Sequence, residues 1–400
     1  MSIDIKIKNA RLRNQTGIFT VSIKDNKIVS INHDDTNKPE LTIDAKGGLV
    51  TESYVIAHLH LDKVYTCERA DPSALLLYQS NEMNTKKAID LASFAKRSYT
   101  QEDISRRVTK VLQKAITYGA THIRGFVDID SKIKLKAIKT ILELKEKFKD
   151  RLELQLVAFP QEGISEQPNI LELIERSLKL GADVVGGIPW IEEGKERQRS
   201  NIIKLLNLAK KYDAPAAMLV DDCKSRDSKT IDILAEETFR LGLRGRVEAC
   251  HARAMQYYYK NELQHTINLL NEAKIGLVSS PHTGPYHAPL DVLERSGITV
   301  ALGQDDCEDA YYPYGRCKMI EVAYLASHIL RMMDGWSMNK LYDWITTNPA
   351  KIIGLAGFGM TKGKRANLIV LKDKSIHEAF TNQSEPEFVI HEGKLVYERI

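Results

Sequence analysis

The sequence contains no long apolar run. No uninterrupted apolar stretch in its 400 residues approaches the roughly 20 residues that a membrane-spanning helix needs. The opening residues, Met-Ser-Ile-Asp-Ile-Lys-Ile-Lys, alternate polar with apolar side chains and lack the apolar centre of a signal peptide. We therefore predict a cytoplasmic protein without a membrane partner.

Cysteine is also scarce, and its placement argues against a disulfide scaffold. The five cysteines are odd in number and widely spaced: Cys67, Cys223, Cys250, Cys307 and Cys317. They show none of the short spacings that mark zinc-binding cysteine motifs. We expect reduced thiols, as in an intracellular protein.

A large excess of one charge sign is missing as well. Lys and Arg total 57 against 53 Asp and Glu, which leaves a net charge of +4. The basic residues are scattered along the chain, whereas phosphate binding requires a concentrated basic face. We therefore expect no nucleic-acid partner.

The middle of the chain alternates short apolar runs with segments of helical periodicity. We expect strands at residues 55–59, 123–127, 154–159, 184–188, 216–220, 247–251, 275–279 and 299–302. Helical spacing lies between most of them, and Thr100 before Asp103 is a capping signal for one helix. Eight buried strands that alternate with helices predict an α/β fold, a (β/α)₈ TIM barrel. A doubly wound sheet is the competitor, but the glycine-rich loop that it wants after the first strand is absent.

Both ends of the chain have a different character. Short strands with turn signals are expected at residues 4–8, 19–23, 27–31 and 41–43, and again at 367–371, 388–390 and 394–397. We predict a small composite β-sandwich from residues 1–50 and 355–400, around a barrel at 51–354. Residues 65–98 are long for a βα connection, and either a cover over the barrel mouth or a surface excursion fits them.

Chemistry in a barrel is found where the strands end at the carboxyl face. The first expected strand ends in His58-Leu-His60, the sixth ends at His251, and Asp305-Asp306 follow the eighth. Residues i and i+2 of a strand point to one side, so the two imidazoles can share a metal ion. The sequence predicts a metal site at the barrel mouth.

Several motifs carry a resemblance to a known family. They are His58-Leu-His60-Leu-Asp-Lys, Phe159-Pro-Gln-Glu-Gly163, Gly181-Ala-Asp-Val-Val-Gly-Gly187, Cys250-His251-Ala and Gly303-Gln-Asp-Asp-Cys-Glu-Asp309 with Tyr312-Pro-Tyr-Gly315. Over essentially its whole length the chain resembles the amidohydrolase superfamily, in the branch of bacterial cytosine deaminase and the isopropylammelide amidohydrolases.

The resemblance implies a role for each matching residue. His58, His60 and Asp305 would hold one divalent ion, Zn²⁺, Fe²⁺ or Mn²⁺. Asp305 would also take a proton from the attacking water, which His251 would polarise, and Asp222 would stand at the proton-shuttle position. The residues implied to contact the substrate, a small nitrogen heterocycle that loses ammonia, are Gln161, Asp306 and Tyr311. The resemblance also suggests a homo-oligomer.

The chain departs from this pattern at the fifth strand. The family has His-x-Asp-Glu there, where the His is a third metal ligand, but this chain has Leu219-Val220-Asp221-Asp222. Leucine cannot bind a metal, and Asp222 is one methylene shorter than Glu. Asp221, two residues after Leu219, is a further candidate ligand.

Two other functions compete with the aminohydrolase. Hydrolysis of cyclic amides at a binuclear centre normally needs a lysine on the fourth strand, and Val184-Val-Gly-Gly-Ile188 has none. A catalytically degenerate barrel that binds a ligand or a partner is favoured by Leu219. The presence of His58, His60 and Asp305 argues against it.

Overall fold

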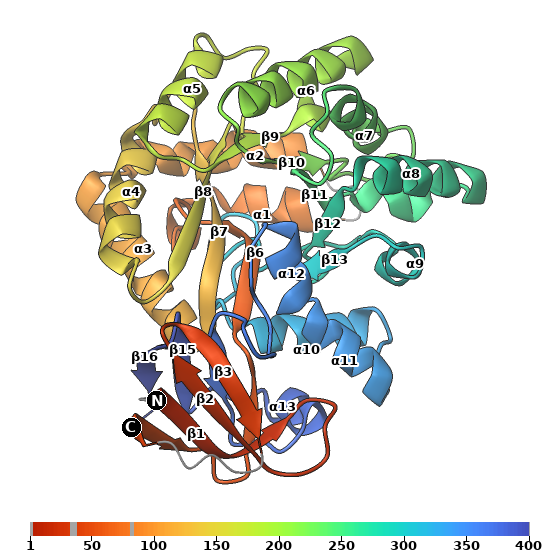
Figure 1. Ribbon diagram of the computed structural model, residues 1–400. Coiled ribbons are helices and arrows are strands. Elements are labelled where there is room, and N and C mark those ends of the chain that lie inside the picture. Colours follow the sequence, from red (N-terminus) through yellow and green to blue (C-terminus); the bar gives the residue numbers. More distant parts are fainter. Residues whose placement is uncertain (1–2, 33–37, 81–83, 400) are drawn as a thin grey trace.

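The computed structural model describes residues 3–32, 38–80 and 84–399. Figure 1 shows two parts, a barrel surrounded by helices and a sheet below it that contains both the first and the last strands. Among the described helices, none has the length and apolar character needed to cross a membrane.

The barrel contains all eight strands that the sequence predicts. They follow one another as parallel neighbours in the order of the chain. Their bounds are β6 (Tyr54–His60), β7 (Ala120–Asp128), β8 (Glu153–Phe159), β9 (Val184–Gly187), β10 (Ala216–Val220), β11 (Val247–His251), β12 (Gly276–Ser279) and β13 (Val300–Leu302). A parallel bridge between Leu59 and Asp305 brings the last strand back to the first. All nine residues of β7 are buried, as expected for a parallel strand covered on both faces.

Helices cover the outside of the barrel (Figure 1). They are α3 (Gln101–Thr117), α4 (Lys136–Phe148), α5 (Ile170–Leu180), α6 (Gly194–Lys211), α7 (Thr230–Arg240), α8 (Lys260–Ala273), α9 (Leu290–Arg295), α10 (Met319–Ile329), α11 (Gly335–Asp343) and α12 (Thr347–Ile352). The side chain of Thr100 accepts a hydrogen bond from the backbone N–H of Asp103, so the predicted cap of α3 is confirmed. Helix α5 buries Ile170, Ile174 and Leu178, one stripe at helical spacing. It ends at Gly181, whose φ of 115° suits glycine.

The two ends of the chain form one eight-stranded sheet. It comprises β1 (Ile3–Leu12), β2 (Phe19–Lys24), β3 (Lys27–Asn32), β4 (Pro39–Asp44), β5 (Leu49–Glu52), β14 (Leu368–Val370), β15 (Phe388–His391) and β16 (Lys394–Glu398). Strand β1 pairs with β2 and β4 through its first part and with β5 near its end, so it links the two halves. Apolar side chains from both halves, including Ile7, Val21 and Leu368, share one buried cluster. Helix α13 (Ile376–Asn382) lies between β14 and β15 in the chain.

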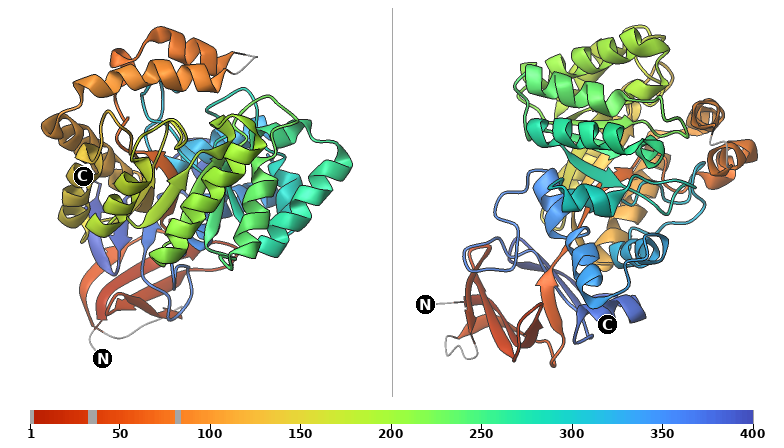
Figure 2. Two further views of the ribbon diagram at one scale, coloured as in Figure 1. Left: turned by 90° about the horizontal axis from the view of Figure 1, so that it is seen from above. Right: turned by 90° about the vertical axis from the view of Figure 1, so that its right-hand side faces the viewer.

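The long excursion after β6 contains two helices, α1 (Pro72–Gln79) and α2 (Thr85–Ala92). Its residues 81–83 lie outside the described part of the chain. Figure 2 shows the two helices as a pair that stands off one side of the barrel. The side chain of Gln79 donates hydrogen bonds to the carbonyl oxygens of Thr283 (2.8 Å) and Tyr311 (3.0 Å). The excursion therefore contacts loops at the carboxyl ends of the barrel strands.

Short 3₁₀ helices complete the described structure at four places. They are η1 (Cys67–Arg69), η2 (Ser93–Ser98), η3 (Pro189–Ile191) and η4 (Arg253–Tyr257).

Candidate metal centre and active site

The candidate metal ligands meet at the seam between the first and last strands of the barrel. His58 and His60 come from β6, and Asp305 follows β13. The backbone N–H of Asp305 donates to the carbonyl of His58 (2.9 Å), and the N–H of His60 donates to the carbonyl of Asp305 (2.8 Å). A Cβ atom on Gly303 would lie 2.8 Å from the Cβ of His58, so glycine permits this close approach. The seam itself therefore positions the three side chains.

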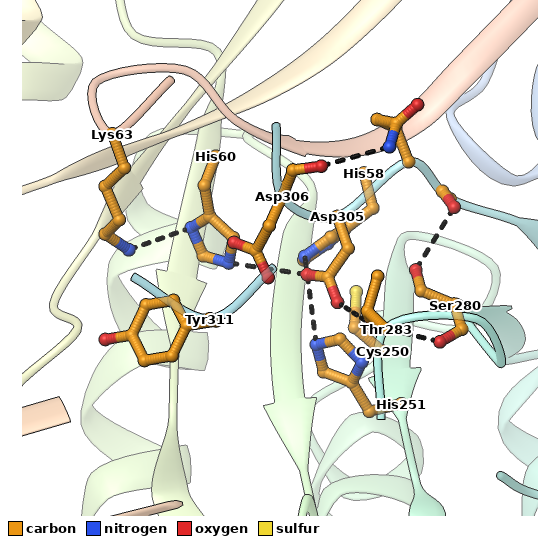
Figure 3. Close-up of polar contacts among 12 residues, drawn as sticks. His58, His60, Lys63, Cys250, His251, Ser280, Thr283, Asp305, Asp306 and Tyr311 are labelled. Atoms are coloured by element: carbon orange, nitrogen blue, oxygen red, sulfur yellow. Dashed lines mark hydrogen bonds and ion pairs between the residues drawn. The ribbon is translucent and has the colours of Figure 1, made fainter. Parts of the chain in front are cut away.

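Three imidazole rings face one carboxylate oxygen (Figure 3). Oδ1 of Asp305 lies 3.1 Å from Nε2 of His58, 3.8 Å from Nε2 of His60 and 3.7 Å from Nε2 of His251. His58, His60 and Asp305 each offer a ligand atom, and these atoms all lie within 4.8 Å of one another. Two ligands held about 2.0–2.1 Å from a tetrahedral ion are about 3.3 Å apart. The separations from Asp305 are close to this value.

The donor set fits a divalent cation. Both ring nitrogens of His58 are buried, and neither makes a well-aligned hydrogen bond to another described residue. Burial is the main cause that lowers the pKa of His60, followed by the charge of Lys63, which favours the neutral imidazole that metals bind. Burial alone would raise the pKa of Asp305, but the imidazoles of His251, His58 and His60 hold it well below its usual value. Neutral nitrogen donors beside an ionised carboxylate are a ligand set for Zn²⁺, Fe²⁺ or Mn²⁺.

His251 stands at the end of β11, directed at the same carboxylate (Figure 3). Its φ of 68° and that of Asp305, also 68°, lie in the left-handed region that non-glycine residues rarely adopt. Such strained backbone collects at functional sites, where the surrounding structure holds it in place. Burial lowers the pKa of His251, which keeps its imidazole neutral and able to accept a proton.

The structure does not bring Asp221 into this group. One carboxylate oxygen accepts hydrogen bonds from the hydroxyls of Ser228 (2.6 Å) and Thr230 (2.7 Å) and from the N–H of Thr230 (2.9 Å). The other accepts from the N–H of Ile231 (3.0 Å). Asp221 therefore caps the first turn of α7 and is engaged away from His58 and His60.

Asp222 lines the pocket beside Leu219 and His251. Its Oδ1 lies 2.7 Å from Nε of Arg253, and both side chains are buried. Arg253 was not among the residues predicted from the sequence. Its only signal was a charged residue between Ala252 and Ala254, just after the end of a strand.

The expected substrate-binding residues Gln161 and Tyr311 line the same pocket. Lys63 joins them: its Nζ donates to the amide oxygen of Gln161 and lies 3.1 Å from Nδ1 of His60. The same Nζ is 5.8 Å from the centre of the Tyr311 ring. Lys63 is in turn 3.1 Å from Asp128, a buried carboxylate that also pairs with Lys96. The ammonium of Lys63 thus connects a candidate metal ligand with two candidate substrate contacts.

Asp306 faces the pocket next to Asp305. Burial, reinforced by the charges of Asp305 and Asp309, raises the pKa of Asp306 well above its usual value. A protonated carboxyl group donates a hydrogen bond, whereas an ionised one only accepts. Asp306 can therefore donate to a ligand acceptor.

The pocket is covered by the α1–α2 excursion. Tyr78 of α1 and Thr85 and Ile89 of α2 form part of its lining, together with Ile188 from the barrel. The hydroxyl of Thr85 donates to the carbonyl of Asp222 (3.1 Å). The pocket thus has polar groups around His60 and Asp305 and apolar groups beside them, as small-molecule sites commonly have.

Known proteins resemble the chain over nearly its full length. N-isopropylammelide isopropyl amidohydrolase of Pseudomonas sp. (strain ADP) is 28% identical over 395 residues, 98% of this chain and 97% of that protein. Pterin deaminase of Rhizobium rhizogenes is 24% identical over 370 residues, 88% and 82% of the two chains. The crystal structure of 5-methylcytosine deaminase from Klebsiella pneumoniae, liganded with 5-fluorocytosine, superposes with a TM-score of 0.89 and 30% identity, covering 99% of this chain and 98% of that one.

The amidohydrolase family model matches residues 68–397, most of the chain. The match takes in His251 and Asp305, while His58 and His60 lie just before it. Together with the fold and the relatives, this shows that the protein is a member of the amidohydrolase family, in the branch of cytosine deaminase and the isopropylammelide amidohydrolases.

Proposed function

We propose that the protein is a metal-dependent aminohydrolase that releases ammonia from a small nitrogen heterocycle. One observation carries the proposal: the rings of His58 and His60 converge on Oδ1 of Asp305 at the mouth of the barrel. The names of three relatives support the substrate class, because each contains a nitrogen heterocycle. They are an isopropylammelide amidohydrolase, a pterin deaminase and a 5-methylcytosine deaminase.

His58, His60 and Asp305 would hold one divalent ion, Zn²⁺, Fe²⁺ or Mn²⁺. Such an ion supplies Lewis acidity, which lowers the pKa of a water molecule at the ion towards ~7. Two imidazoles and a carboxylate would give the ion more oxygen character than three imidazoles would.

The protein's own groups would then handle protons and charge. Asp305 would accept a proton from the attacking water and return it to the leaving nitrogen, because its carboxylate stays ionised among the three imidazoles. Nε2 of His251, 3.7 Å from Asp305, would accept a hydrogen bond from the attacking water and so polarise it.

Gln161, Asp306 and Tyr311 would hold the ring of the substrate. The amide of Gln161 offers a donor and an acceptor to an amide edge, and Tyr311 offers an aromatic face. The hydroxyl of a protonated Asp306 would donate to a ring nitrogen or carbonyl. All three line the pocket that contains His60 and Asp305.

A catalytically degenerate barrel is the weaker alternative. Leu219 removes one nitrogen ligand, but the remaining ligand atoms still converge and are buried. Burial of such a cluster is costly unless a partner satisfies it.

We further propose a domain division at residues 1–50 and 355–400 for the sheet and 51–354 for the barrel. We also propose a cytoplasmic protein without a membrane partner, and the near-neutral charge balance with scattered basic residues supports the absence of a nucleic-acid partner. The resemblance supports a homo-oligomer.

An ammonia-release assay tests the proposed function. Protein reconstituted with Zn²⁺, Fe²⁺ or Mn²⁺ is offered aminopyrimidines, aminotriazines and cyclic guanidines. We expect release from at least one of them, and none from protein stripped by a chelator. A silent panel with metal content verified would overturn the proposal.

A further inference from the structure

Arg253 is a buried charge that none of the roles above uses. Only 1% of its surface is exposed, although it sits just outside the pocket. Burying a guanidinium costs several kcal/mol unless its charge and its N–H groups are all matched. The partners of Arg253 therefore indicate what it is there to hold.

Those partners come from the edge of the pocket. Nε lies 2.7 Å from Oδ1 of Asp222. Nη2 donates to the hydroxyl of Thr283 (2.9 Å) and approaches the hydroxyl of Tyr78 on the covering helix α1 (3.3 Å). Nη1 donates to the carbonyl of Tyr286 (2.5 Å). The guanidinium thus contacts the end of β10, the loop after β12 and helix α1, which lies over the pocket.

The surroundings are shaped for this side chain. A Cβ atom on Gly284 would lie 2.7 Å from Nη1 and 2.9 Å from Cζ of Arg253, so a side chain at this position would displace the guanidinium. Ala252 adopts a φ of 49°, which turns the chain after β11 before Arg253. A passive surface arginine would need neither feature.

A polar chain runs from Asp222 through Arg253 to Asp305. The hydroxyl of Thr283 accepts from Nη2 of Arg253 and donates to Oδ2 of Asp305 (2.7 Å). Nη2 is itself 3.9 Å from that oxygen. Arg253 therefore fixes the position of Asp222 relative to the carboxylate at the metal centre.

This pairing changes what Asp222 is suited to do. A proton carrier has to reorient between the water and the leaving group, but one oxygen of Asp222 is bound to a rigid guanidinium. A fixed carboxylate that lines a pocket is suited to accept an N–H of a ligand in a charge-assisted hydrogen bond. It lines the pocket together with the apolar side chain of Leu219.

We propose that Asp222 anchors an N–H group of the heterocyclic substrate, and that Arg253 is the positioning residue that holds Asp222 in place. The proton transfer then rests with Asp305 and His251. This inference rests on the proposed function and assigns the specificity-determining edge of the same site.

An anchoring role and a proton-carrying role of Asp222 predict different kinetics, because the first changes KM and the second changes kcat. Asp222→Asn keeps the size of the side chain and removes its charge. Loss of a charge-assisted anchor should raise KM by about 10- to 100-fold while kcat changes by less than about threefold. Arg253→Met should do the same because it frees Asp222, and Arg253→Lys should recover part of the loss. The double variant should be no worse than the poorer single variant.

Three controls keep the result interpretable. Arg244→Met removes an exposed arginine just before β11, at the opposite end of that strand from Arg253, and should leave KM unchanged. Metal content should stay at the wild-type value in every variant, which a collapsed site would not show. Gly284→Ala, which crowds the guanidinium without altering any charge, should raise KM in the same direction as Arg253→Met.

The assays use metal-loaded protein with cytosine, melamine and creatinine as probes, with turnover measured as ammonia and binding measured by calorimetry. If Asp222→Asn lowers kcat at least about 100-fold with KM unchanged, Asp222 carries the proton. The inference about Asp222 is then wrong, while the proposed function stands. If the metal-loaded wild type neither binds nor deaminates any probe, the proposed function fails and the inference with it.

Discussion

Oδ1 of Asp305 lies 3.1 Å from Nε2 of His58, across the seam where the last strand of the barrel meets the first. The carbonyl of His58 also accepts a hydrogen bond from the N–H of Asp305, so the two residues contact each other through both their backbones and their side chains. Closure of the barrel is therefore also the assembly of the candidate metal site. A change that opens this seam should cost both stability and metal affinity.

Removing the groups that act on the attacking water should abolish turnover. His251→Asn and Asp305→Ala should each lower the rate of ammonia release by at least about 100-fold, because one polarises the water and the other accepts its proton. Only Asp305→Ala should also reduce the metal content. Steady-state ammonia assays with elemental analysis check both statements. Activity that survives Asp305→Ala would show that another group is the proton acceptor.

Leu219→His should tighten metal binding. The new imidazole would add a nitrogen ligand beside His58 and His60. Loss of a residue that only hydrogen-bonds to a metal ligand already weakens metal affinity about 10- to 100-fold, so a whole ligand should matter at least as much. We expect at least a 10-fold lower Kd for Zn²⁺, measured by competition with a chromophoric chelator. Leu219→Ile, which adds no donor, is the matched control. Equal affinity in wild type and Leu219→His would mean that the side chain at position 219 does not face the ion.

Acid should destabilise the fold through His391 in the terminal sheet. Burial, with a contribution from His122, lowers the pKa of His391 to about 4, whereas an unfolded histidine titrates near 6.5. Between these values the unfolded state binds a proton that the folded state does not, so stability is lost as the pH falls from about 6.5 to about 4. One pKa unit corresponds to about 1.4 kcal/mol, so the loss can reach about 3 kcal/mol.

Denaturant unfolding at several pH values, with a chelator present so that metal release does not contribute, measures this loss. His391→Asn should reduce the dependence over that interval, while the other buried histidines keep their share of it. His265→Asn, which changes an exposed histidine of α8, should leave it as in the wild type. An unchanged slope in His391→Asn would contradict the assignment.

The sequence was enough to predict all eight barrel strands and the three residues at the seam. Strand periodicity put His58 and His60 on one side of β6, and parallel strands bring their ends to one edge. Asp221, by contrast, was expected beside these ligands and does not lie there. Residues i and i+2 share a face only while the strand continues, but β10 ends at Val220 and Asp221 has a φ of 47°, which turns its side chain towards α7.

Arg253 could not be predicted for a related reason. It follows two residues with positive φ, His251 and Ala252, and begins the short helix η4. Strand periodicity says nothing about the direction of a side chain after such a turn. The strand β5 of the terminal sheet was also not expected, since it is its pairing with β1 and β14 that makes so short a segment a strand.

Elemental analysis of the purified protein tests the central claim most directly. The account predicts about one divalent ion per chain after reconstitution with Zn²⁺, Mn²⁺ or Fe²⁺, and a clear loss in His58→Ala, His60→Ala and Asp305→Ala but not in the control His265→Ala. Metal no higher than background in the reconstituted wild type, or unchanged metal in all three ligand variants, would contradict it.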